Sequence, residues 1–166
     1  MHKKSRQMAL GGIFAALAVV IMSLGGLIPV ATYVCPMLCM MLEAMVLCLC
    51  GKRVAWAWYG AVAILGLLLG PDKEAAAVFA ALGPYPIFKL RMDQWKGKWL
   101  WKGLYFNSVI LALYWLLMHL FGMDALVKEF AELGSFLTIL TLILGNVVFL
   151  LVDKVLQRFM GRIYGR

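Results

Sequence analysis

Hydrophobic residues run along this chain in long, nearly uninterrupted stretches, separated by short segments that carry the charges and prolines. A helix that crosses the roughly 30 Å hydrocarbon core of a bilayer needs about 20 mostly apolar residues. Such stretches lie at about residues 7–27, 32–50, 54–70, 74–88, 100–121 and 135–152. Transmembrane β-strands would instead give short segments of alternating polarity. The pattern predicts an all-α, polytopic membrane protein, a six-transmembrane-helix bundle that forms one domain over residues 1–166.

The fourth stretch is the least regular. It is short, and Gly83-Pro84-Tyr85-Pro86 interrupts it. A broken helix is tolerated at membrane depth where it lines a cavity or is buried in protein. We therefore expect this stretch, which follows the turn at Pro71-Asp72-Lys73-Glu74, to shape a binding pocket.

The first stretch follows a basic segment, as the core of a cleaved signal peptide also does. Its apolar run is longer than the usual 7–15 or so residues of such a core, and no clear small-x-small cleavage site lies beyond it. We expect a retained transmembrane helix.

The amino-acid composition is also typical of a protein that is surrounded by lipid. Of the 166 residues, 64% are hydrophobic and 14% are charged, whereas soluble domains are about half apolar and a quarter charged. Eight acids and sixteen bases cannot cover the surface of a water-soluble protein with so many apolar residues.

The basic residues indicate the orientation. With the N-terminus inside, residues 3–6, 52–53, 89–102 and 154–166 are cytoplasmic, and only Lys73 and Lys128 of the sixteen bases fall outside. This is the bias of the positive-inside rule. It predicts a multi-pass protein of the cell (plasma) membrane with both termini cytoplasmic.

The net charge of +8 follows from the same segments. The bases lie in short loops next to predicted spans, where they face anionic lipid headgroups. Trp95, Trp99 and Trp101 accompany them, as expected for an aromatic belt at the membrane interface. We therefore expect the lipid bilayer, and no nucleic acid, as the partner of this charge.

The outer segments are acidic, because five of the eight acids fall there against two bases. Residues 124–134 read as a short amphipathic segment that has Leu126, Phe130 and Leu133 on one face. Two interpretations stay open for it: a lid on the outer surface, or an ordinary solvated connector.

Motifs for enzyme chemistry are missing. The chain has no G-x-x-x-x-G-K-[ST], H-E-x-x-H or G-x-S-x-G, and its only histidines are His2 and His119. His119 lies near the outer end of the fifth stretch, where it is either an interface residue or a ligand. We expect no enzymatic activity and no cofactor.

The four cysteines do not predict a metal site. Cys35 and Cys39 lie one turn apart, and Cys48 and Cys50 lie near the other end of the same predicted helix. At 1.5 Å per residue the pairs are roughly 15–20 Å apart, so they cannot converge on one zinc ion as four ligands must. We read them as small packing residues.

Polar residues inside predicted spans are costly there and are therefore candidates for function. Glu43 could bind a proton, a cation or a substrate amine, or it could pair with a base from another helix. Asn107 and Asn146 can bridge helices by hydrogen bonds or contact a ligand.

The first predicted helix carries two rows of small residues. Ala9, Gly12 and Ala16 form one row, and Gly11, Ala15 and Ala18 form another beside it. Small residues let a second helix approach closely. This approach could serve packing inside the bundle or docking to another protein.

These residues resemble a known family, the substrate-binding S components of energy-coupling factor (ECF) transporters. Those proteins have six helices with both termini inside, and their first helix carries A-x-x-x-A. Here Gly11-x-x-x-Ala15 and Gly12-x-x-x-Ala16 replace the strict motif. Other segments look like an uncharacterised S-component-like subgroup: Pro71-Asp72-Lys73-Glu74-Ala75-Ala76, Gly83-Pro84-Tyr85-Pro86-Ile87-Phe88-Lys89 and Gly145-Asn146-Val147-Val148-Phe149.

The resemblance implies a subunit that captures a vitamin-like or other small micronutrient from outside. It implies docking of the first helix to a transmembrane coupling protein and transport driven by two ATPase subunits. The coupling-interface residues are then Gly11, Gly12, Ala15 and Ala16. The implied substrate-binding residues are Tyr33, Lys73, Glu74, Tyr85, His119 and Asn146.

Two other classes remain open. One is a structural or assembly membrane protein that oligomerises through the first helix. The other is a stand-alone proton-coupled carrier that uses Glu43, against which the lack of a visible inverted repeat argues.

Overall fold

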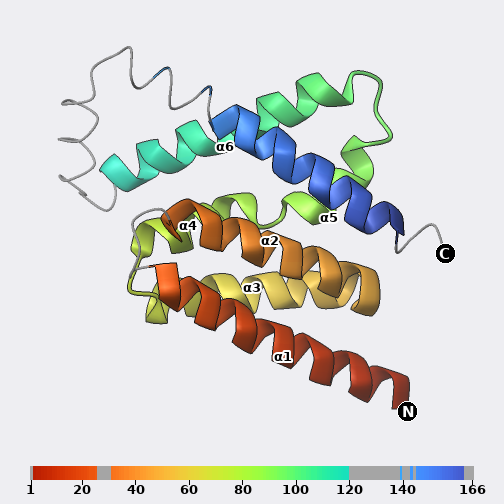
Figure 1. Ribbon diagram of the computed structural model, residues 1–166. Helices are drawn as coiled ribbons and strands as arrows, with labels where there is room; N and C mark the ends of the chain where they lie inside the picture. Colours follow the sequence, from red (N-terminus) through yellow and green to blue (C-terminus); the bar gives the residue numbers. More distant parts are fainter. Residues whose placement is uncertain (1, 26–30, 120–138, 140–142, 144, 163–166) are drawn as a thin grey trace.

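A computed structural model describes residues 2–25, 31–119, 139, 143 and 145–162 (Figure 1). Apart from short turns, these residues are helical, and no strand occurs among them, which confirms the all-α prediction. The helices are α1 (His2–Gly25), α2 (Ala31–Cys50), α3 (Lys52–Leu69), α4 (Lys73–Leu82), α5 (Tyr85–Met92) and α6 (Lys98–His119). Residues 145–162 form a further helix, called the C-terminal helix below. The amphipathic segment at 124–134, interpreted as either a lid or a connector, lies outside the described residues.

The predicted fourth stretch forms two helices, α4 and α5. Asp72 caps α4, because its Oδ1 accepts a hydrogen bond from the amide of Ala75 at 3.0 Å. The interruption is narrower than predicted: only Gly83 and Pro84 separate the helices, and Tyr85 already begins α5. Pro86 is helical because the first turn of a helix does not need its missing amide hydrogen.

Gly83 allows a close approach at this break. A Cβ atom at Gly83 would lie 2.6 Å from the carbonyl oxygen of Phe79 and 2.8 Å from Cε2 of Tyr59. The hydroxyl of Tyr59 donates a hydrogen bond to the carbonyl of Ala80, one turn before the break. The break is thereby packed directly against α3.

The helices run back and forth along one direction (Figure 1). Helices α1, α2 and α3 contact one another, and α2 also contacts α4 and α5, which in turn contact α6. The C-terminal helix lies beside α6 (Figure 1), and hydrogen bonds between their side chains join the two. The first residues of α1 and the last described residues of the C-terminal helix lie at the same end of the molecule (Figure 1).

Aromatic rings fill the junction between α5, α6 and the C-terminal helix. The rings of Phe106 and Phe149 stack with centroids 4.6 Å apart. Tyr85 meets Phe149 edge to face at 4.7 Å. Such ring pairs add about 0.5–1.5 kcal/mol each beyond their buried area, so this junction is a stable platform for the polar groups beside it.

The outer surface of the molecule is strongly apolar. Large aliphatic side chains are exposed on separate helices, including Ile13 on α1 at 65%, Leu68 on α3 at 71% and Leu100 on α6 at 83%. The interior, by contrast, holds the fully buried charged residues Glu43, Lys89, Lys102 and Asp153. Soluble proteins bury charges rarely and expose few contiguous apolar patches.

By length and composition, two of the described helices could cross a membrane, over Ser5–Leu24 and Lys52–Leu69. The apolar part of α2, Val34–Cys50, is slightly shorter. By length and composition alone, the described residues thus contain two candidate membrane spans.

Candidate functional site

A buried cluster of charges joins α5, α6 and the C-terminal helix. Its centre is Asp153, which is 1% exposed. Oδ1 of Asp153 accepts hydrogen bonds from the Tyr85 hydroxyl, at 2.5 Å, and from Lys89 Nζ. Oδ2 of Asp153 accepts one from Lys102 Nζ at 2.9 Å. Asp93 completes the cluster, with carboxylate oxygens 3.4 Å from Lys89 Nζ and 2.5 Å from Lys102 Nζ.

Helical spacing brings these groups together. Tyr85, Lys89 and Asp93 follow one another at four-residue intervals along α5 and its C-cap, so they share one side of the helix. Asp153 lies between Phe149 and Leu156 on the buried side of the C-terminal helix. The apolar residues one turn before and after Asp153 thus place its carboxylate on the inward side of the helix.

Two acids and two lysines make the cluster electrically balanced. Burial acts to raise the pKa of Asp153, but the hydrogen bonds from Lys102, Lys89 and Tyr85 outweigh burial and hold that pKa below its usual value. Asp153 therefore stays ionised, and three of its roughly four acceptor sites are occupied. This arrangement suits a clasp between helices rather than a nucleophile or a general base.

The sequence interpretation did not identify this clasp. Of the clasp residues, only Tyr85 was among the predicted substrate-binding residues, and the structure shows its hydroxyl donating to Asp153. The sequence did contain a signal. Asp93 is the single acid within the basic segment 89–102, and Asp153 directly precedes the basic segment 154–166, which contains no acid. An isolated acid beside so many bases indicates a specific partner.

Glu43 lies fully buried on α2, and neither carboxylate oxygen has a hydrogen-bond partner among the described residues. No base in that part of the chain forms an ion pair with it. Pairing with a base from another helix, one of the two roles considered for Glu43, is thus not found there. A buried carboxyl group without a partner is costly, which leaves it as a candidate binding group.

Lys73 and Glu74 are engaged in contacts within the protein. Lys73 Nζ donates hydrogen bonds to the carbonyl of Leu67 at 2.8 Å and to that of Leu68 at 3.4 Å, which satisfies the C-terminal end of α3. Glu74 Oε1 accepts a hydrogen bond from the Tyr114 hydroxyl at 3.0 Å. Lys73 thus holds the α3–α4 turn in place, and Glu74 joins α4 to α6.

Asn146 pairs with Asn107 through two reciprocal amide hydrogen bonds, each 3.0 Å long. This is the bridging role, one of the two roles considered for the asparagines of the predicted spans. The side chains of Tyr33 and His119 lie outside the described residues.

Three of the predicted pocket residues lie beside different positions along α6. Tyr85 belongs to the clasp that Lys102 of α6 joins through Asp153. Asn146 bonds Asn107 of α6, and Glu74 bonds Tyr114 of α6. Twelve residues separate the first and last of these α6 positions, or about 18 Å along a helix. The described residues of the predicted pocket therefore form three interhelical contacts and are not gathered around one cavity.

The two rows of small residues on α1 have different surroundings. Gly11 is buried, with Val54 Cγ1 3.8 Å from the position of a Cβ, and Ala18 is fully buried. Gly12 and Ala16 are exposed, and a Cβ on Gly12 would meet nothing within 4 Å. Ala15, which belongs to the same row as Gly11 and Ala18, is half-buried. One row packs inside the bundle, and the other is open.

The cysteines are free thiols that pack within the bundle. Cys39 Sγ donates to the carbonyl of Ala18 at 3.6 Å, and Cys50 Sγ donates to that of Gln7 at 3.5 Å, so both link α2 to α1. Among the residues described, no group of three or more His, Cys, Asp or Glu side chains could hold a metal ion.

Comparison of the chain with protein-family models, with curated proteins and with solved structures finds no match. Its function must therefore be argued from the arrangement of its own residues.

Proposed function

We propose that the chain is a multi-pass protein of the cell membrane, with six spans and both termini cytoplasmic. The distribution of polarity supports this proposal: apolar side chains cover the outside of the helices, and charges lie between them. Such an arrangement is favourable only where lipid replaces water around the bundle. The pair α4 and α5 acts as one broken span, and the C-terminal helix forms part of the sixth.

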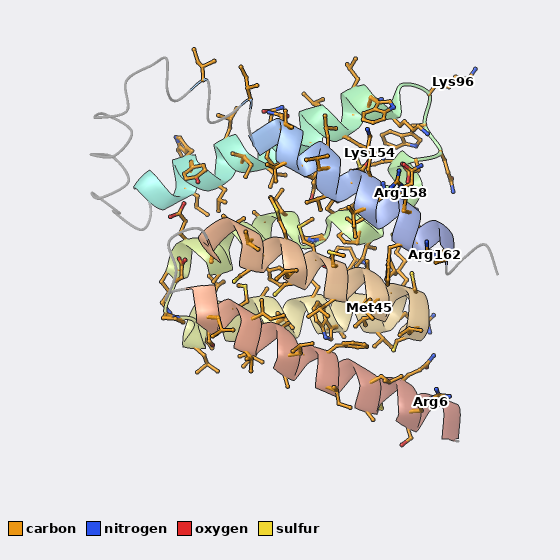
Figure 2. All side chains as sticks on the ribbon, in the orientation of Figure 1. Arg6, Met45, Lys96, Lys154, Arg158 and Arg162 are labelled. Atoms are coloured by element: carbon orange, nitrogen blue, oxygen red, sulfur yellow. The ribbon has the colours of Figure 1, made fainter. Side chains whose placement is uncertain are left out.

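The position of the bases supports the orientation. Arg6, Lys96, Lys154, Arg158 and Arg162 lie at one end of the molecule, the end where α1 begins (Figure 2). The positive-inside rule assigns such an end to the cytoplasm. Lys73, one of the two bases expected outside, is the first residue of α4. The turn between α3 and α4 lies at the opposite end of the molecule (Figure 1).

We further propose that the protein is the substrate-binding subunit of an ECF-type importer. It captures a vitamin-like or other small micronutrient from outside and docks to a transmembrane coupling protein and its two ATPase subunits. The observation that carries this proposal is the open row on α1. Gly12 and Ala16 are exposed on a helix at the edge of the bundle, although the neighbouring row is packed. A smooth apolar face of this kind suits close contact with another membrane helix.

Co-purification tests the partner assignment. The tagged protein, extracted in mild detergent, should bring down two ATPase chains and one transmembrane scaffold protein. Gly12→Leu places a side chain on the open row and should release all three partners. Ala57→Leu, on an exposed position of α3, is the matched control and should retain them. Recovery of the tagged protein with only itself would instead support a structural or assembly role.

The substrate can be identified by ligand-induced stabilisation. A ligand at 100 times its Kd stabilises the folded state by about 2.7 kcal/mol, which raises the unfolding temperature measurably. A panel of vitamins and their precursors should give one compound with this effect in detergent. If no compound in a broad panel shifts the transition, substrate capture by this chain is contradicted.

A second candidate function is supported by Glu43. Its buried carboxyl group has no partner in the described part of the chain, as expected for a group that takes up a proton during a transport cycle. On this alternative the chain is a stand-alone proton-coupled carrier. Glu43→Gln should then abolish proton-linked uptake, and unchanged uptake would exclude the carrier.

A further inference from the structure

The carboxyl group of Glu43 lies inside the bundle, on the helix that packs against α3, α4 and α5. Glu43 is fully buried, and neither of its oxygens has a hydrogen-bond partner among the described residues. A buried polar group without a partner in a native protein calls for an explanation, such as a bound ion or water. The groups around Glu43 indicate which of these fits.

The break between α4 and α5 leaves one carbonyl group without its helical donor. Pro84 has no amide hydrogen that could bond the carbonyl of Ala80, four residues earlier. The hydroxyl of Tyr59 donates to this carbonyl instead. Because the single hydrogen of that hydroxyl is committed to Ala80, the Tyr59 oxygen can act toward other groups only as an acceptor.

Two tyrosine hydroxyls share the surroundings of Glu43. Electrostatic interactions link Glu43 to Tyr59 on α3 and to Tyr105 on α6, and they also link the two tyrosines to each other. Three oxygen-bearing side chains from three helices thus lie near one another beside the break. Glu43 in its ionised form is also only an acceptor, so it and the Tyr59 oxygen cannot bond each other directly.

Neighbouring acceptors are stabilised by a positive group between them. A proton on Glu43 would need a partner within hydrogen-bond distance, and the described residues place none there. A hard cation reaches farther, because oxygen ligands about 2.3–2.6 Å from an ion such as Ca²⁺ lie up to about 5 Å from each other. The single negative charge of Glu43 matches a monovalent ion, and oxygen ligands match a hard one.

We propose that Glu43, Tyr59 and Tyr105 form a binding site for a sodium ion. The carboxylate neutralises the ion, and the two hydroxyl oxygens supply further ligands. The last turn of α4 contributes the negative end of its helix dipole, which favours a cation, and carbonyl ends of broken helices coordinate ions in other membrane proteins. Full burial of Glu43 favours sodium over the larger potassium ion, because cavity size sets cation selectivity.

This inference does not rest on the ECF assignment, and it goes beyond the proton-coupled carrier. In an importer subunit, the ion would stabilise the packing of the broken span. In a stand-alone carrier, sodium would take the place of the proton as the coupling ion. Without sodium, Glu43 remains a buried carboxyl group without a partner in the described part of the chain.

Unfolding of the full chain in detergent micelles tests the site. The folding equilibrium constant is measured in sodium, potassium and choline chloride at equal ionic strength. A ligand at ten times its Kd raises this constant about elevenfold. We expect sodium to stabilise the protein increasingly with its concentration, potassium to act more weakly, and choline to have no effect. Binding of radioactive sodium to the folded protein, measured by scintillation proximity, gives a readout that does not depend on unfolding.

Two variants and two matched controls assign the binding to these residues. Glu43→Gln keeps the size of the side chain and removes its charge, so it should abolish sodium binding. Tyr105→Phe removes one ligand oxygen and should weaken binding severalfold. Glu74→Gln and Tyr114→Phe alter a hydrogen bond between α4 and α6, about 13 Å farther along α6 than Tyr105. Both controls should bind sodium as the unmodified protein does.

Three results would overturn the site: equal stability in the three salts, equal affinity for sodium and potassium, or sodium binding that survives Glu43→Gln. Stabilisation by acid in place of sodium would also overturn it and would favour the proton-coupled carrier. The co-purification of partners described above does not depend on sodium. A failure of this inference is therefore distinguishable from a failure of the proposed function.

Discussion

Replacement of Asp153 by asparagine should destabilise the protein strongly. Lys89 and Lys102, which are 1% and 2% exposed, would keep only Asp93 as a counterion. Three hydrogen bonds reach the Asp153 carboxylate, and bonds to charged groups contribute about 1.5–3 kcal/mol each. The side-chain oxygen of an asparagine at this position would keep part of this hydrogen-bond energy. Removal of one partner from a buried ion pair costs about 3–5 kcal/mol, and we expect a loss in that range.

The assay is the free energy of unfolding, measured by titration of purified protein in mixed micelles with a denaturing detergent. Asp72→Asn is a control for the loss of a partly exposed carboxylate, since Asp72 caps α4 through a hydrogen bond from the Ala75 amide. Asparagine caps helices about as well as aspartate, so this control should cost well under about 1 kcal/mol.

A compensated variant tests whether charge is the cause. Lys89→Met, Lys102→Met, Asp93→Leu and Asp153→Leu together replace both lysines and both of their carboxylate partners by apolar groups, which is often neutral or stabilising. This quadruple variant should recover most of the loss. If Asp153→Asn costs no more than Asp72→Asn, or if the quadruple variant is the least stable of all, the clasp does not hold these helices together.

Three further predictions concern single features of the bundle. Glu43→Leu should raise the free energy of unfolding by about 1–3 kcal/mol, because it removes a buried carboxyl group without a partner; a loss of stability would reveal a partner. Asn107→Leu should cost about 1 kcal/mol, and adding Asn146→Leu should cost little more because the two amides bond each other; additive losses would contradict this pairing. Because the folded-state pKa of Asp153 is lowered, its contribution is present above the unfolded-state pKa of about 3.9 and is lost as pH falls through the folded value. Stability should thus be flat near neutral pH and fall below about pH 4, a fall that Asp153→Asn should reduce; an unchanged acid limb would exclude Asp153 as its source.

The positions of the helices could largely be predicted because apolar runs and prolines act locally. The break between α4 and α5 was expected from Gly83 and Pro84. Its width was wrong by two residues, since a helix can begin at Tyr85 and accept Pro86 in its first turn. Local rules locate an interruption better than the point where the next helix starts.

The clasp could not be predicted from local pattern. Asp153 lies 51 residues from Lys102 and 64 from Lys89 in sequence, so their contact depends on the tertiary arrangement. The two rows on α1 show the same limit. Gly11 and Gly12 are adjacent and chemically identical, and only the placement of α3 buries one and leaves the other open.

The central claim is a bundle embedded in the membrane with its basic end in the cytoplasm. Cysteine labelling in intact cells tests it most directly, in a chain whose four native cysteines are replaced. We predict that a cysteine at position 73 reacts with a membrane-impermeant maleimide from outside, and that one at position 96 reacts only after the cells are permeabilised. Equal reaction of both positions in intact cells, or the reverse pattern, would contradict the account.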